Sequence, residues 1–276
     1  GQVLLESPAH LALSPDGHGG MLGALVRNGC LAAARARGIE QFFYLQIDNP
    51  LTRIGAEDFL GYHLLAGSEL STLAVAKRTP TDRVGNVAAI AGRVRVIEYS
   101  DLPADVAERR APDGGLELWA GNTAIHLLSA AFLERMADQA DSLPFHLARK
   151  KVPFVDESAR LHEPSAPNAI KFERFIFDLL PQAREALVVE VEEATDFAPV
   201  KNAPGEARDT PEAVQAALVA LHASWLRDAG VEVAPGVPVE ISPLFARDAA
   251  EVAAKRAQLP AGLAITEATY FCKNRG

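Results

Sequence analysis

A near-continuous apolar run over residues 39–49 constrains the fold of this chain more than any other stretch of its sequence. Aromatic and branched residues dominate the run, which predicts a strand buried on both faces of an α/β sheet. The run ends in Asp48 and Asn49. Because ligands of open α/β sheets bind beyond the carboxyl ends of parallel strands, Asp48 is a candidate ligand for a hard cation such as Mg²⁺. The alternative is a turn that Asp48 caps and whose geometry Asn49 tolerates.

The composition excludes several classes of protein. With 276 residues, of which 49% are hydrophobic and 23% charged, the chain can build one large domain or two unequal ones. The formal net charge of −9 argues against a nucleic-acid partner, although a few local Lys or Arg residues could hold a small phosphate.

No apolar run approaches the ~18 residues of a membrane span, and no signal-peptide pattern opens the chain. We therefore expect no membrane partner. Two cysteines are too few for a disulfide framework, which favours a reducing cytoplasm.

A glycine-rich turn lies near the start of the chain. Residues 17–20 contain three glycines in four positions, and the apolar spacing that follows predicts a helix from Met21 to Arg37. Such a turn lets the backbone approach a ligand closely, and the helix N-terminus after it is a plausible cradle for an anion or a sugar. It is not a nucleotide P-loop, because no Gly-Lys-Ser/Thr follows. A plain tight loop is the alternative.

Further along the chain, strand and helix patterns alternate. Leu70–Ala76 reads as a buried strand, residues 87–97 as a hairpin, and Leu143–Lys150 as a helix. Apolar residues at helical spacing also predict a helix over Ile170–Asp178. Lys171 would begin this helix, where the helix dipole disfavours a cation, so a nearby anion or simple solvation would explain it. The alternation predicts an α/β fold with a mainly parallel mixed sheet and flanking helices.

The last quarter of the chain reads as a separate unit. Thr210 and Pro211 are an N-cap and a first-turn proline, and they predict a helix that runs to Arg227. Short β-like pieces and one Ala-rich helix follow. We expect a partial catalytic nucleotidyltransferase domain over residues 1–203 and a small C-terminal α+β domain over residues 204–276.

Seven stretches share an order and spacing that resemble the UDP-sugar pyrophosphorylase family, and within it the UDP-N-acetylglucosamine pyrophosphorylase branch. They are Pro15–Gly20, Ile47–Asn49, Val96–Ser100, Gly121–His126, Asn168–Asp178, Phe197–Asn202 and Val239–Leu244. The resemblance covers almost the whole chain. It implies a fold of the nucleotide-diphospho-sugar transferase type, with the N-terminal part absent from this chain.

The resemblance also implies the reaction. UTP and a sugar 1-phosphate, here an N-acetylhexosamine 1-phosphate, would give UDP-sugar and pyrophosphate, with Mg²⁺ as cofactor. The sugar phosphate oxygen attacks the α-phosphorus and pyrophosphate leaves in line, a step that needs positioning and charge neutralisation rather than a protein nucleophile. By resemblance, Gly17 and Lys171 bind the nucleotide. Lys201 and Asp48 are the catalytic residues, and Asp48 acts together with the metal.

Four further positions face the sugar by the same resemblance: His18, Glu98, Tyr99 and Asn122. Taken singly, each has a plainer interpretation, because most charged and polar residues lie at surfaces and an Asn after a Gly is a common turn. Three histidines lack metal-ligand spacing and are expected to be structural: His126, His146 and His222.

The chain departs from the family pattern at two places. The N-terminal Gly-rich loop that carries a Gly-Thr-Arg segment is missing from this chain. In addition, His18 stands where the family usually has asparagine, which keeps UDP-glucose or UDP-galactose formation open as an alternative. A chain without the phosphate loop could also be a non-catalytic sugar-nucleotide-binding protein.

The chain alone is therefore expected to turn over poorly. The measurement is pyrophosphate release by this polypeptide with UTP, Mg²⁺ and a sugar 1-phosphate. A rate near that of an intact relative would contradict the expectation.

Overall fold

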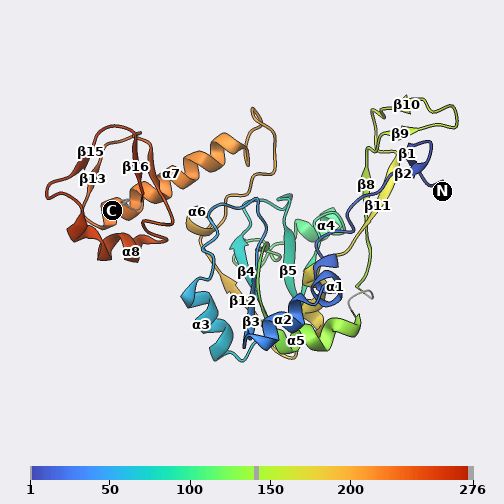
Figure 1. Cartoon of the computed structure of the whole chain (residues 1–276), viewed down its shortest axis with the longest axis horizontal. Helices are drawn as coiled ribbons and strands as arrows, with labels where there is room; N and C mark the ends of the chain where they lie inside the picture. Colours follow the sequence, from blue (N-terminus) through green and yellow to red (C-terminus); the bar gives the residue numbers. More distant parts are fainter. Residues whose placement is uncertain (1, 140–142, 273–276) are drawn as a thin grey trace.

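The computed structural model describes residues 2–139 and 143–272, which form three parts (Figure 1). A central mixed sheet is covered by helices. An arm of short strands projects from one side of this central body, and a C-terminal unit lies on the opposite side at the end of the long helix α7 (Pro211–Asp228). None of the helices in the described ranges is long and apolar enough to cross a membrane.

The central sheet has the strand order β12-β4-β7-β5-β6, and β3 also pairs with β7. Its strands are β3 (Gln41–Tyr44), β4 (Leu70–Ala76), β5 (Gly85–Ile90), β6 (Arg93–Ile97), β7 (Ala120–Ser129) and β12 (Ala186–Glu190). The prediction of a mixed α/β sheet is confirmed, as are the strand at Leu70–Ala76 and the hairpin of β5 and β6.

The pairing within this sheet differs from the mainly parallel one expected. β3, β4, β5 and β12 run in one direction, but β7 lies among them and runs antiparallel to β3, β4 and β5. Among the described residues, the ladder of β4 and β12 is the only parallel one in this sheet. A strand inserted in the opposite direction turns parallel neighbours into antiparallel pairs, and the order of elements along the chain does not reveal such an insertion.

Two strands share one edge of β7, end to end. β3 pairs with its second half, where Tyr44 lies opposite His126, and β5 begins at its first half, where Gly85 lies opposite Asn122. Between these two pairings Ala124 has a φ of 59°, in the left-handed region. The chain that follows β3 therefore leaves the sheet at this junction, and it carries Asp48 with it.

Helices cover both faces of the sheet. One face packs against α1 (Gly20–Arg27), α2 (Cys30–Ala36), α5 (Ala130–Met136) and the 3₁₀ segment η2 (Ile176–Gln182). The other face packs against α3 (Glu57–Leu65). Neighbouring residues of β7 point to opposite faces, so Leu128 joins the first core and Leu127 the second. The single helix expected over residues 21–37 is divided in two by Gly29, whose φ is 69°.

The arm corrects two predicted helices. β8 (His146–Lys150) and β11 (Ala169–Glu173) form an antiparallel ribbon, where residues 143–150 and 170–178 were expected to be helical. Lys171 is paired across the ribbon with Ala148, so the argument from a helix dipole does not apply to it. Residues 170–173 alternate apolar and charged side chains, which is the period of a strand.

The far end of the arm is a small four-stranded sheet with the order β10-β9-β1-β2. Its strands are β1 (Leu5–Ser7), β2 (His10–Leu11), β9 (Phe154–Val155) and β10 (Leu161–His162). The ribbon of β8 and β11 connects this sheet to the central body (Figure 1).

The C-terminal unit has its own core. α7 is capped by Thr210, whose Oγ1 accepts from the Ala213 amide, and it packs against α8 (Ala249–Ala254) and two short parallel strand pairs. These pairs are β13 (Glu232–Val233) with β15 (Ala264–Ile265) and β14 (Val239–Ile241) with β16 (Thr269–Phe271). Short segments complete the described chain: α4 (Ala104–Ala107), α6 (Glu193–Asp196), η1 (Ala137–Gln139) and η3 (Arg256–Gln258). The boundary at residues 203 and 204 stays a prediction.

The glycine-rich turn packs against the backbone that follows β11. The Arg174 amide donates to the Asp16 carbonyl at 2.6 Å, and the Gly19 amide donates to the Arg174 carbonyl at 2.8 Å. A Cβ on Gly17, whose φ is 82°, would lie 2.3 Å from that same carbonyl oxygen. Because Gly17 has no side chain, the backbone at Arg174 can pack directly against it.

We expect Gly17→Ala to destabilise the chain strongly. Gly38 provides a matched control, because its φ is 72° but a Cβ there would meet open space. Gly38→Ala should cost about 1–2 kcal/mol for its left-handed backbone, and Gly17→Ala about 2–3 kcal/mol more for the clash. Denaturant unfolding of both variants measures the difference. Equal losses would show that the turn does not need this close approach.

Candidate functional site

Asp48 and Lys201 form an ion pair at the end of β3. The Lys201 Nζ atom lies 2.5 Å from Asp48 Oδ2, and the Val200 amide donates to the Asp48 carbonyl at 2.9 Å. The two side chains remain 26% and 44% exposed, so both can be reached by a ligand. The structure thus brings together the two predicted catalytic residues, which stand 153 positions apart in the sequence.

Asn49 attaches the loop of Lys201 to the turn of Asp48. Its buried side chain donates from Nδ2 to the Asp196 carbonyl at 2.8 Å and accepts at Oδ1 from the Ala198 amide at 2.9 Å. The sequence suggested only that Asn49 tolerates a turn. The position of Asn49 directly after Asp48 was the one sequence feature that could have indicated that it connects the two loops.

His18 lies in a row of aromatic and imidazole rings, which we call the ring cluster: His126, Tyr44, His18, Phe175, Phe177 and His146. The Ile176 amide donates to His18 Nδ1 at 3.1 Å, which leaves the ring proton on Nε2. Burial lowers the pKa of His18 to about 4, with smaller contributions from the charges of Lys201 and His146. At neutral pH His18 is therefore an uncharged ring that donates through Nε2.

Glu98 follows β6 and lines a cavity of about 270 Å³, together with His146, Phe177 and Asp178. Burial raises the pKa of Glu98 to about 7, and the nearby Asp101 carboxylate adds to this effect. Near neutral pH the carboxyl group can donate as well as accept a hydrogen bond. Tyr99, next in the chain, is 45% exposed.

Asn122 lies on β7, at the junction of β3 and β5, and is buried. Its Oδ1 accepts from Thr72 Oγ1 at 2.9 Å and from the Ala124 amide at 3.2 Å. The side-chain oxygen is thus used within the fold, and the amide N–H groups are what Asn122 can offer to a ligand.

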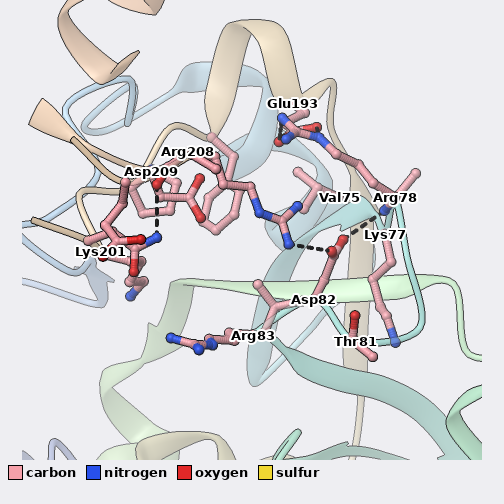
Figure 2. A pocket seen from close by; sticks show the side chains of 17 residues that line it. Val75, Lys77, Arg78, Thr81, Asp82, Arg83, Glu193, Lys201, Arg208 and Asp209 are labelled. Carbon is pink, nitrogen blue, oxygen red and sulfur yellow. Dashed lines mark hydrogen bonds and ion pairs between the residues drawn. The ribbon is translucent and has the colours of Figure 1, made fainter. Parts of the chain in front are cut away.

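A second cavity, of about 260 Å³, is lined in part by Lys201 (Figure 2). Arg83 and Arg208 line it with Lys201, and Asp82 lies among them, with Arg208 Nη2 at 3.4 Å from Asp82 Oδ1. Arg83 is exposed and forms no ion pair within residues 2–139 and 143–272. The lining also holds Lys77 and Arg78, which makes five basic side chains against four acidic ones: Asp82, Glu193, Glu206 and Asp209. Arg83, which has no carboxylate partner among the described residues, can bind an anionic ligand such as a phosphate.

The two predicted nucleotide-binding residues lie on other segments of the chain. Lys171 is on β11 in the arm, and within the described chain it makes no hydrogen bond or ion pair with Asp48 or Lys201. Gly17 faces the Arg174 backbone, as described above. Of the expected convergence, the structure shows the contact of Asp48 with Lys201, and the part of Lys171 in the site stays a prediction.

His146 was expected to be structural, and the structure places it in the wall of the cavity that Glu98 lines. Its ring contacts Asp101 and Asp178, which stand 45 and 32 positions away. Local residue spacing cannot predict contacts between residues so far apart in the sequence.

We expect Glu98→Gln to stabilise the chain at alkaline pH. The folded chain favours the neutral acid, so its stability falls as the pH rises from about 4.5 to about 7 and then levels off. The substituted chain, with a neutral amide at this position, lacks this loss and should be more stable at pH 8, by at most roughly 3 kcal/mol. Unfolding curves at pH 5 and pH 8 test this. Glu157→Gln, at an exposed position, is the control, and equal pH responses in both variants would contradict the expectation.

Comparison with known proteins identifies the family. The sequence pattern of the UTP–glucose-1-phosphate uridylyltransferase family matches residues 4–232. The UDP-N-acetylglucosamine pyrophosphorylase of Saccharomyces cerevisiae is 38% identical over 243 residues, which cover 87% of this chain and 51% of the relative. The human UDP-N-acetylhexosamine pyrophosphorylase-like protein 1 is 36% identical over 231 residues, which cover 83% of this chain and 46% of the relative.

Solved structures agree with this. A protein of Entamoeba histolytica named as a UDP-N-acetylglucosamine pyrophosphorylase superposes with a TM-score of 0.83 at 29% identity, over 98% of this chain and 65% of that one. The Trypanosoma brucei enzyme of the same name shares the fold, with a TM-score of 0.76 at 23% identity, over 100% of this chain and 59% of that one. The chain spans about half the length of the curated relatives it matches. It belongs to the UTP–glucose-1-phosphate uridylyltransferase family, the UDP-sugar pyrophosphorylases that its motifs resemble.

Proposed function

We propose that the protein is a uridylyltransferase that makes UDP-sugar and pyrophosphate from UTP and an N-acetylhexosamine 1-phosphate. The sugar phosphate oxygen forms a bond to the α-phosphorus of UTP, and the bond from that phosphorus to the pyrophosphate oxygen breaks. No protein nucleophile is needed, and the chain contributes positioning and charge.

The position of Lys201 carries this proposal. On one side its ammonium lines the cavity that also holds Arg83 and Arg208, which suits phosphate groups. On the other side its charge acts on His18 and Glu98, the candidate sugar-facing residues. A cation between a phosphate side and a hydroxyl-binding side is what transfer to a sugar phosphate requires, because negative charge develops at that boundary in the transition state.

Asp48 is the residue that would hold Mg²⁺. No group of three or more His, Cys, Asp or Glu side chains in the described ranges could form a metal site by itself. A single carboxylate suits Mg²⁺, which proteins commonly bind through one or two carboxylates together with substrate phosphates. When bound, the ion would neutralise phosphate charge, and Lys201 would then be free to turn from Asp48 toward the substrate.

The N-acetyl sugar is the first candidate because the named relatives at 31–38% identity are UDP-N-acetylglucosamine or UDP-N-acetylhexosamine pyrophosphorylases and similar proteins. His18 favours the alternative of a glucose or galactose 1-phosphate, since a ring at this position is bulkier than the asparagine of the family pattern. A sugar-nucleotide-binding protein without turnover is the third possibility. For the compartment we propose the cytoplasm, which suits the free thiols of Cys30 and Cys272.

Calorimetric titration of the chain with UDP-N-acetylglucosamine and UDP-glucose, in the presence of Mg²⁺, tests the function. Lys201→Met should weaken binding about 10- to 100-fold, the range expected for loss of a charged hydrogen bond to phosphate. Lys151→Met, at an exposed position in the arm, should leave binding unchanged.

The outcomes separate the candidates. If the unsubstituted chain binds neither UDP-sugar, or if both lysine variants bind alike, the proposed site is wrong. Tighter binding of UDP-glucose would replace the N-acetyl sugar as substrate. Binding without Mg²⁺-dependent pyrophosphate release, in a protein as long as its relatives, would support the non-catalytic alternative.

A further inference from the structure

His146, the first residue of β8, joins three segments that are distant in the sequence. Its Nδ1 lies 2.8 Å from Asp101 Oδ2, and its Nε2 lies 2.9 Å from Asp178 Oδ2. Asp101 follows β6 and Asp178 belongs to η2, so one imidazole connects the base of the arm to two segments of the central body. The side chains of His146 and Asp178 are only 18% and 14% exposed, which shields this contact from water.

The contacts of His146 favour the charged form of its ring. Both ring nitrogens can donate at once only when the imidazole carries two protons. Burial disfavours that charge, but the hydrogen bonds to Asp101 and Asp178 outweigh burial and raise the pKa of His146 above its ordinary value. The ring cluster therefore combines His146, whose raised pKa favours the charged form, with a neutral His18.

Each aspartate is tied to a residue of the cavity wall. The Asp101 amide donates to the Glu98 carbonyl at 2.9 Å and so closes the turn that carries Glu98. Asp178 directly follows Phe177, and the His146 ring centroid lies 6.2 Å from the ring of Phe177. Glu98, Phe177 and His146 all line the cavity of about 270 Å³.

We propose that His146 is a positioning residue for the sugar-binding side of the site. Through Asp101 it fixes the turn of Glu98, and through Asp178 it fixes the ring of Phe177. This inference rests on the proposed function, because it requires the cavity to receive the sugar of the substrate.

A purely structural role would look different. The desolvation of a partly buried ion cluster offsets much of its attraction, so replacing all members can leave stability nearly unchanged, whereas removing one member leaves unpaired charges. A variant with His146→Leu, Asp101→Asn and Asp178→Asn should therefore fold about as stably as the unsubstituted chain. If His146 positions the cavity wall, this variant will still bind the sugar poorly.

Other titratable or charged groups face this cluster: Glu98 and Arg95 from the cavity wall, Glu173 opposite His146 on β11, and His18 in the ring cluster. As the pH rises through the raised pKa of His146, the ring loses one N–H and releases one aspartate. Glu98 changes charge near pH 7 as well. Only the part of any pH dependence that disappears in His146→Gln can therefore be assigned to His146.

The test compares the affinities of UDP-N-acetylglucosamine and UDP by calorimetry, because their ratio reports the contribution of the sugar. His146→Gln should reduce this ratio at least fivefold and change UDP affinity less than twofold. His162→Gln is a matched control, since His162 also contacts an aspartate, Asp156 at 2.7 Å, but lies in the far sheet of the arm. In the unsubstituted chain, imidazole NMR should find both nitrogens of His146 protonated at pH 6.

Each result decides one point. An unchanged ratio in His146→Gln, or a single N–H on His146 at pH 6, overturns the positioning role while the proposed function stands. If the unsubstituted chain binds neither ligand, the proposed function fails and this inference fails with it. Should His146→Gln not fold, the triple variant and Asp101→Asn, at a 42% exposed side chain, take its place.

Discussion

The buried amide of Asn49 is the contact on which the candidate site depends. The Asp48–Lys201 ion pair cannot hold the two loops together, because pairs between such exposed side chains contribute only about 0–1 kcal/mol. The two hydrogen bonds of Asn49 are buried, and each partner left unsatisfied would cost about 1–3 kcal/mol. Asp48 and Lys201 can therefore give up their ion pair to bind ligands, while the hydrogen bonds of Asn49 keep the two side chains close together.

The site has two sides of different chemical character. Aromatic rings, His18 and Glu98 line one side, where burial lowers the pKa of His18 to about 4 and raises that of Glu98 to about 7. Charged side chains line the other, where Arg83 and Arg208 share one cavity with acidic groups such as Asp82. Lys201 stands at the border between them. This division suits a substrate with an uncharged sugar at one end and a phosphate at the other.

Much of the sheet could be predicted from sequence, because burial leaves a direct signature there. Leu70–Ala76 is apolar throughout most of its length, lies inside the sheet and matches β4. Residues 170–178 misled the interpretation because their apolar positions fit a helix, although residues 170–173 alternate with period two and the strand gives way to η2 at Ile176. The pairing of Asp48 with Lys201 followed from the family resemblance. The contacts of His146 and Asn49 depend on tertiary structure that no local pattern encodes.

The arm and the site share their points of attachment. β8 begins at His146, and β11 ends at Glu173, one residue before the backbone that holds the glycine-rich turn. The two long strands of the arm thus enter the central body where Glu98, Phe177 and His18 are anchored. A load applied to the far sheet of the arm would therefore reach the cavity wall of Glu98, Phe177 and His146 first.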